Sequence, residues 1–142
     1  ISLFFDFGYS PDPVGEFTRS LDVVQALRAR LCLPGHGRTF TDVHAHIEGN
    51  RELVAEHLAK ILAVIGAGEA EDGSEGQAGS DAEAGEPLTA FEILPRVHGA
   101  DLSPMTAQWL LTETLAMLRH LEVTDRARRI PGEPERWAAV AV

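Results

Sequence analysis

The stretch LPGHGRTF, from Leu33 to Phe40, sets one histidine between two glycines. It follows a short apolar run and precedes a polar segment in which Thr41 or Asp42 could cap a helix. The two glycines give His36 no neighbouring side chain to pack beside, and they permit unusual backbone angles. We therefore predict a buried strand over residues 31–33 that ends in a loop presenting His36.

Periodic apolar residues flank this loop on both sides. A Ser-Pro-Asp-Pro turn at residues 10–13 precedes apolar residues at helical spacing from Val14 to Arg30, and the spacing returns from Val43 to Ile65. Both stretches predict amphipathic helices. With the strand between them they form an α/β segment, and loops at the C-terminal ends of strands are where such proteins usually place their chemistry.

Residues 66–86, GAGEAEDGSEGQAGSDAEAGE, carry seven acidic residues, no basic residue and nothing apolar larger than alanine. Such a segment buries too little surface to offset the entropy of ordering it, so we predict a disordered acidic linker. The formal net charge of -10 is concentrated there, because residues 1–65 carry eight acids against six bases and residues 87–142 carry seven against six. Neither flank shows the basic surface of a nucleic-acid binder or a membrane-binding face.

Two helices are predicted after the linker. Thr89 and Glu92 stand at capping-box spacing and open a short helix over residues 89–95. A serine followed by proline then opens a longer helix over residues 103–120.

A small hairpin is predicted next, with residues 121–123 and 127–131 as its strands. Short helices, one long helix and a terminal hairpin suggest a winged-helix-like module over residues 87–142.

The single cysteine, Cys32, lies in the apolar run before the loop, so no intrachain disulfide can form and a buried structural thiol is predicted. No apolar run approaches membrane-spanning length, and the first residues given do not show the charged-then-apolar order of a signal peptide. We expect a soluble, cytoplasmic protein without a membrane partner. The chain begins at Ile1 with no methionine and no lead-in, so we expect it to belong to a longer protein.

Residues 20–42, SLDVVQALRARLCLPGHGRTFTD, followed by a long helix, resemble the C-terminal half of a metallo-β-lactamase-fold hydrolase of the glyoxalase II-like branch. The part from Leu88 to Trp137 resembles the winged-helix domain often appended to those hydrolases. The resemblance implies an α/β fragment over residues 1–65, the C-terminal part of an αββα sandwich. It also implies a mainly α winged-helix-like domain over residues 87–142.

In that family a Pro-Gly-His-Gly loop supplies the last histidine ligand of a two-zinc site, so the resemblance implies that His36 is a metal ligand. The implied activity is hydrolysis of an ester, thioester or phosphodiester by a metal-activated hydroxide, with zinc, iron or manganese as the metal. The other ligands of the family lie upstream of this loop and have no counterpart here, so we expect this portion alone to be inactive. His44-Ala45-His46 imitates their His-x-His motif but lacks its aspartate and final histidine.

Three aromatic residues near the start of the chain, Phe5, Phe7 and Tyr9, follow the place of an upstream ligand and could line the approach of a small-molecule substrate. Alternatively they pack in the core or in loops. The remaining histidines are expected to be structural; they are His57, His98 and His120.

A second interpretation is a binding module for nucleic acid or a protein partner. Arg126, Arg128 and Arg129 cluster near the predicted hairpin and could contact nucleic acid or an anionic substrate. The long helix before them groups apolar residues around Trp109 and has one base, Arg119, which is typical of a packing helix and disfavours nucleic acid. We interpret the module as a lid or a dimerisation element, so a homodimer is one expected assembly.

Overall fold

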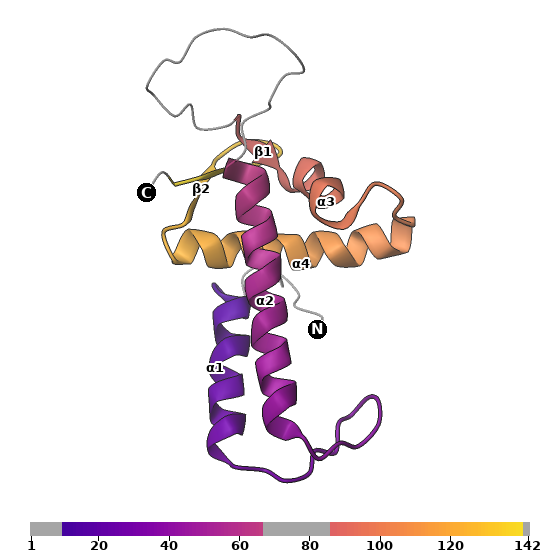
Figure 1. Cartoon of the computed structure of the whole chain (residues 1–142). Coiled ribbons are helices and arrows are strands. Elements are labelled where there is room, and N and C mark those ends of the chain that lie inside the picture. Colours follow the sequence, from indigo (N-terminus) through magenta and orange to yellow (C-terminus); the bar gives the residue numbers. More distant parts are fainter. Residues whose placement is uncertain (1–9, 67–85, 141–142) are drawn as a thin grey trace, which may run out of the picture.

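The computed structural model describes residues 10–66 and 86–140. Within them lie four helices and three short strands (Figure 1). In chain order these are α1 (Pro13–Ala26), α2 (Val43–Gly66), β1 (Leu88–Thr89), α3 (Ala90–His98), α4 (Pro104–Val123), β2 (Ala127–Ile130) and β3 (Arg136–Ala139). Nearly all of the predicted linker, residues 67–85, lies outside the described residues.

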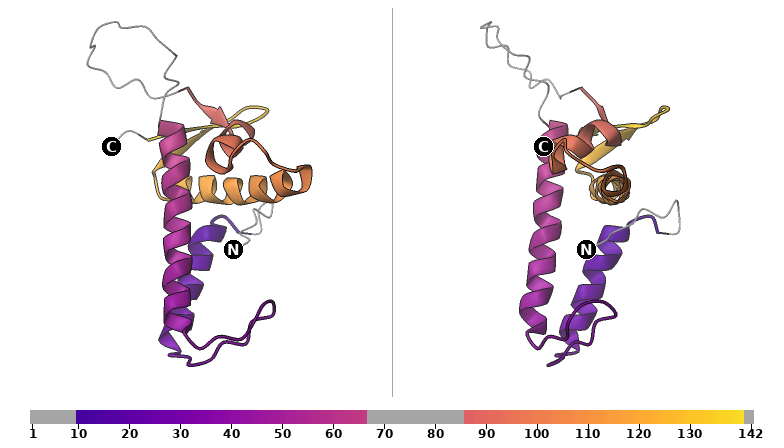
Figure 2. Two further views of the ribbon diagram at one scale, coloured as in Figure 1. Left: turned by 45° about the vertical axis from the view of Figure 1, so that its right-hand side comes forward. Right: turned by 90° about the vertical axis from the view of Figure 1, so that its right-hand side faces the viewer.

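Helix α2 is a long helix against which the other elements are arranged (Figure 2). Helix α1 lies beside its N-terminal half, and the other elements gather around its C-terminal half. We call residues 17–51 the foot, and residues 52–66 with 86–140 the head. Among the described residues, no helix combines the length and apolarity needed to cross a bilayer.

Helix α1 begins at a capped turn. Asp12 is the N-cap, and its Oδ1 accepts a hydrogen bond from the Gly15 N–H at 2.9 Å, while Pro13 fills the first helical position. A Cβ on Gly15 would lie 1.9 Å from Asp12 Oδ2, so the cap requires glycine there. The helix ends at Ala26, earlier than the predicted Arg30, because the chain turns at Arg28, whose φ is +50°.

Helix α2 begins at Val43, as predicted. Of the two candidate caps, Asp42 accepts the hydrogen bond, from the Ala45 N–H at 3.1 Å. The first buried residues of α2 pack in the foot, and the later ones pack in the head. Its buried residues are Val43, Ile47, Val54, Leu58, Ile61 and Ile65.

The buried strand predicted over residues 31–33 is wrong. Only Cys32 pairs, through a single antiparallel bridge to Phe40. Leu31 and Leu33 are 54% and 73% exposed, and Cys32 is half-buried. No neighbouring strand exists among the described residues to extend the pairing, and one bridge cannot bury an apolar run.

The caps predicted in the head are confirmed. Thr89 and Glu92 form the full capping box of α3, with the Glu92 carboxylate accepting from the Thr89 N–H at 2.7 Å. Ser103 caps α4, and Pro104 occupies its first position. Both helices are longer than predicted, reaching His98 and Val123.

The predicted hairpin is wrong in its first strand. Residues 121–123 continue α4, because Leu121 extends the buried stripe of that helix and is 0% exposed. Strand β2 pairs instead with β3, and β3 pairs with β1, giving an antiparallel sheet of order β1-β3-β2. Trp137, at the centre of this sheet, faces Leu88 on one side and Arg129 on the other.

One hydrophobic cluster spans the head and the start of α1. It includes Val14 from α1, Ile61 from α2, Ile93 from α3 and Trp137 from β3, each no more than 1% exposed. Side chains from both sides of residues 67–85 therefore share a core. The three-part domain division itself stays a prediction.

Candidate functional site

The loop that carries His36 is closed at its base by two backbone hydrogen bonds. The Cys32 N–H donates to the Phe40 carbonyl at 2.8 Å, and the Phe40 N–H donates back at 3.3 Å. Cys32 and Phe40 pack against the small cluster of the foot, and the Phe40 ring lies against the His46 ring with centroids 4.1 Å apart. The base of the loop is therefore fixed between α1 and α2.

The tip of the loop presents its histidine to solvent. His36 is exposed, as are the glycines on either side. Gly37 has φ +92°, a conformation that residues with a Cβ rarely adopt, so glycine is required there. A Cβ on Gly35 would meet no atom within 4 Å, so nothing in the described structure demands the first glycine. The prediction that this loop presents a histidine agrees with its observed geometry.

The described residues do not by themselves form a metal site. Among them, no three side chains of histidine, cysteine, aspartate or glutamate come close enough together to hold a metal ion. His44 makes a long contact from its Nδ1 to Gln25 Nε2 at 3.5 Å, and the His46 ring is placed on Phe40. Neither joins His36. A metal bound at His36 would need its remaining ligands from outside the described residues.

Arg51 joins α1 to α2 within the foot. Its guanidinium donates to Asp22 and Glu48 at 2.5 Å each and to the Gln25 amide oxygen at 2.8 Å. The hydrogen bond to Asp22 is the main cause that raises the pKa of Arg51. Arg51 therefore acts as a structural link within the foot.

Of the other predicted site residues, the arginines lie in the head, away from the His36 loop. Phe5, Phe7 and Tyr9 lie outside the described residues. Arg126 and Arg128 are exposed in the head, and Arg128 and Arg129 are neighbours on β2, so their side chains leave opposite faces.

Arg129 is engaged by acidic partners. Its Nε donates to Glu122 at 3.3 Å and its Nη1 to Glu135 at 3.2 Å, and the bond to Glu135 is the main cause that raises its pKa. Contact with an external anion stays a prediction for all three arginines.

Two polar pairs between helices could not be read from the sequence. His120 Nδ1 lies 2.9 Å from the Oδ1 of the α1 cap, Asp12, although 108 positions separate them. His57 Nδ1 lies 3.0 Å from Glu113 Oε1, joining α2 to α4. No spacing rule links residues so far apart, so only tertiary packing shows these contacts.

His98 packs against the second of these pairs, His57 and Glu113. Its ring meets the His57 ring edge to face, with centroids 5.9 Å apart. Burial lowers the pKa of His98, and the nearby His57 lowers it further. All three histidines of the head thus contact other parts of the protein, in line with the structural role predicted for them.

Two solved structures share this arrangement of helices and strands. One is a beta-lactamase domain protein from Burkholderia ambifaria, with a TM-score of 0.72 and 22% identity, where the match covers 94% of this chain and 36% of that chain. The other is a metallo-beta-lactamase family protein from Thermus thermophilus, with a TM-score of 0.67 and 22% identity, covering 98% of this chain and 40% of that chain. This chain therefore has the fold of part of a metallo-beta-lactamase-fold protein.

The matched part is well under half the length of either solved chain. No protein-family model matches this chain, and a search of curated proteins finds no match. The likeness thus concerns the fold, and activity has to be argued from the site.

Proposed function

We propose that this chain is the C-terminal part of a metal-dependent hydrolase of the metallo-β-lactamase fold, in the glyoxalase II-like branch, and that His36 supplies one metal ligand. The observation that carries the proposal is the His36 loop itself. Its base is fixed between two helices, its tip is exposed, and it belongs to a chain whose fold matches such proteins. A neutral imidazole on a loop whose base is fixed is a suitable zinc ligand.

The surface around the loop supports the same proposal. Large apolar side chains are exposed on α1 and on the approach to the loop, where Leu27 is 71%, Leu31 is 54% and Leu33 is 73% exposed. Apolar groups in such numbers usually lie against another surface. The greater part of a metallo-β-lactamase fold, which this chain does not match, would provide that surface.

The chemistry proposed for the complete protein is hydrolysis of an ester, thioester or phosphodiester. Two metal ions, zinc or else iron or manganese, would supply an activated hydroxide. The contribution of the described residues is limited to one imidazole nitrogen at His36 and to the loop that carries it. We therefore expect the 142-residue chain alone to lack hydrolase activity and to bind zinc weakly.

The test is metal content per chain on the longest natural form of the protein, compared with its His36→Ala variant. We expect about two metals per chain, with a clear loss in the variant. His44→Ala is the matched control, because His44 is also exposed but does not lie on the loop. Full metal content in His36→Ala, or no metal in either protein, would overturn the proposal.

A second candidate function concerns the head. In the head, α2 is followed by β1, α3, α4, β2 and β3, with a β1-β3-β2 sheet, and this order supports the proposal of a winged-helix-like module. The start of this winged-helix-like domain at residue 87 stays a prediction. Such modules bind nucleic acid or protein partners.

The charges on the head favour a protein partner over nucleic acid. Arg119, the one base on α4, pairs with Glu122, and Arg129 lies between Glu122 and Glu135. We therefore propose a lid or a dimerisation element. Light scattering tests the dimer, and binding to a DNA duplex whose affinity falls steeply with salt would instead indicate a nucleic-acid binder.

A further inference from the structure

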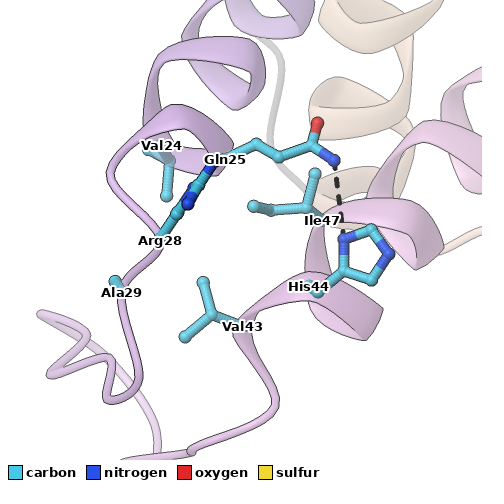
Figure 3. A pocket seen from close by; sticks show the side chains of 7 residues that line it. All are labelled: Val24, Gln25, Arg28, Ala29, Val43, His44 and Ile47. Carbon is cyan, nitrogen blue, oxygen red and sulfur yellow. Dashed lines mark hydrogen bonds between the residues drawn. The ribbon is translucent and has the colours of Figure 1, made fainter.

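A pocket of about 290 Å³ opens between the end of α1 and the start of α2. Figure 3 shows its two walls, one from α1 and the turn after it, the other from the first turns of α2. Its lining residues are Val24, Gln25, Arg28, Ala29, Val43, His44 and Ile47. His36 is not among them, so the pocket is separate from the proposed metal loop.

Most of the lining is apolar. Val43 and Ile47 are 7% and 4% exposed and belong to the packed cluster of the foot, so their side of the pocket is rigid. Val24 and Ala29 complete the apolar part from the α1 side. Such walls favour the hydrocarbon part of a small ligand.

One cation lines the pocket without a partner. Across residues 10–66 and 86–140, no hydrogen bond or ion pair engages the Arg28 guanidinium, whereas Arg51 nearby has three acceptors. A guanidinium beside apolar walls and without a carboxylate partner is suited to bind an anion, and its planar fork matches a carboxylate in bidentate geometry.

The backbone at Arg28 is unusual for an arginine. Its φ of +50° places it in the left-handed region, at the position after a helix end where glycine is the common residue. A residue with a Cβ costs roughly 1 kcal/mol more than glycine in this conformation. The chain thus carries a charged side chain at a position where the backbone alone favours glycine.

The polar edge of the pocket is held in place. The Gln25 amide oxygen accepts from Arg51 at 2.8 Å, and its Nε2 lies 3.5 Å from His44 Nδ1. Both side chains therefore stand beside the pocket as oriented hydrogen-bonding groups, able to hold a second oxygen of a bound anion.

We propose that this pocket binds a small carboxylate with an apolar chain. The carboxylate pairs with Arg28, and the chain lies against Val43 and Ile47. A carboxylate fits better than a phosphate dianion, because the pocket offers one unpaired guanidinium. The site is separate from the proposed metal ligand, since neither His36 nor a metal takes part.

The test uses the whole 142-residue chain and octanoate as the probe, with backbone amide NMR shifts and calorimetry. We expect shifts confined to residues 24–29 and 43–47, and at least tenfold weaker binding for Arg28→Gly. That variant relieves the left-handed backbone, so its thermal midpoint should not fall. Arg30→Gly is the matched control, because it removes the same charge from an exposed residue outside the pocket, and its affinity should stay within twofold.

Two further ligands distinguish the contribution of the carboxylate from that of the apolar chain. Octanol, with the same chain and no charge, should bind at least tenfold more weakly than octanoate, and octyl phosphate should bind no more tightly. The proposal is overturned if octanoate fails to bind, if Arg28→Gly binds it as tightly as the unaltered chain, or if octyl phosphate binds more tightly. None of these measurements depends on metal content. The carboxylate pocket and the metal ligand at His36 can therefore be refuted separately.

Discussion

The head and the foot of this molecule are stabilised in different ways. In the head, three helices and a three-stranded sheet enclose Trp137, Met117 and Leu118, each no more than 1% exposed. In the foot, two helices and a loop bury a small cluster of Leu21, Val43 and Ile47. The head therefore draws most of its core from its own residues, with Val14 of α1 added, whereas the foot leaves much apolar surface exposed.

This contrast predicts which part of the molecule is the more stable. Because apolar burial is the main stabilising contribution, the head should be the more stable part. The foot relies on α2, on the Arg51 link and on the contact between Asp12 and His120. The His36 loop and the pocket at Arg28 both lie in the foot, which is the less tightly packed of the two regions.

The largest expected effect is in the head. Trp137→Ala should lower the free energy of unfolding by about 3–5 kcal/mol, because it empties the centre of the cluster. Urea unfolding followed by circular dichroism measures this. Trp137→Phe should cost less, since it keeps an aromatic ring and removes an indole N–H that is buried without a partner among the described residues.

Trp109→Ala is the matched control for this substitution. Trp109 is 53% exposed on α4, so the same truncation there should change the free energy of unfolding by less than about 1 kcal/mol. Equal losses from the two tryptophan variants would contradict the picture of a head built around Trp137.

The next effect is in the foot. Leu21→Ala should cost about 2 kcal/mol, and the loss should appear mainly as local opening of α1. Hydrogen exchange measures it. We expect amides of α1 to exchange faster in the variant while amides of α4 keep their protection.

A matched control is Leu27→Ala, on the same helix end but 71% exposed, which should leave exchange in α1 nearly unchanged. If α4 loses protection together with α1 in Leu21→Ala, then head and foot unfold as one unit and the division into two regions is wrong.

A smaller effect is expected where the two regions meet. Asp12→Ala removes the cap of α1 and the contact to His120, and should cost about 1–2 kcal/mol. Asp12→Asn keeps a capping oxygen and loses the charge, so it should cost less. The difference between the two variants, measured by thermal unfolding, separates the cap from the interhelical contact. A larger loss in Asp12→Asn than in Asp12→Ala would contradict this assignment.

The smallest effect is a pH dependence in the head. Burial lowers the pKa of His98 in the folded chain, so below pH about 6.5 the unfolded chain binds more protons than the folded one at this residue. Its contribution to stability is therefore present above that pH and is lost as the pH falls. His57, Glu113 and Lys60 are the charged or titratable neighbours.

Unfolding measured between about pH 7.5 and 5 should show a steeper loss of stability in the unaltered chain than in His98→Gln. The control is His36→Gln, which removes an exposed imidazole from the foot. An identical slope in His98→Gln and the unaltered chain would show that His98 does not titrate differently on folding.

Local signals in the sequence predicted much of the head and the helix starts. Capping residues such as Thr89 and Ser103 act within one turn of the chain, so their effect can be read from neighbouring letters. The errors lie where distant residues decide. Residues 121–123 look like a strand until the burial of Leu121 is known, and residues 31–33 look like a buried strand until it is known that no described strand pairs with them.

The candidate sites divide in the same way. The sequence alone determined that His36 lies on a glycine-flanked loop, because glycine spacing is a local property. Only the tertiary structure decided that Arg28 and His44 line one pocket, that Asp12 meets His120 and that Trp137 centres the core. The physical reason is that such contacts depend on how helices pack, and packing sums many weak interactions between residues far apart in the chain.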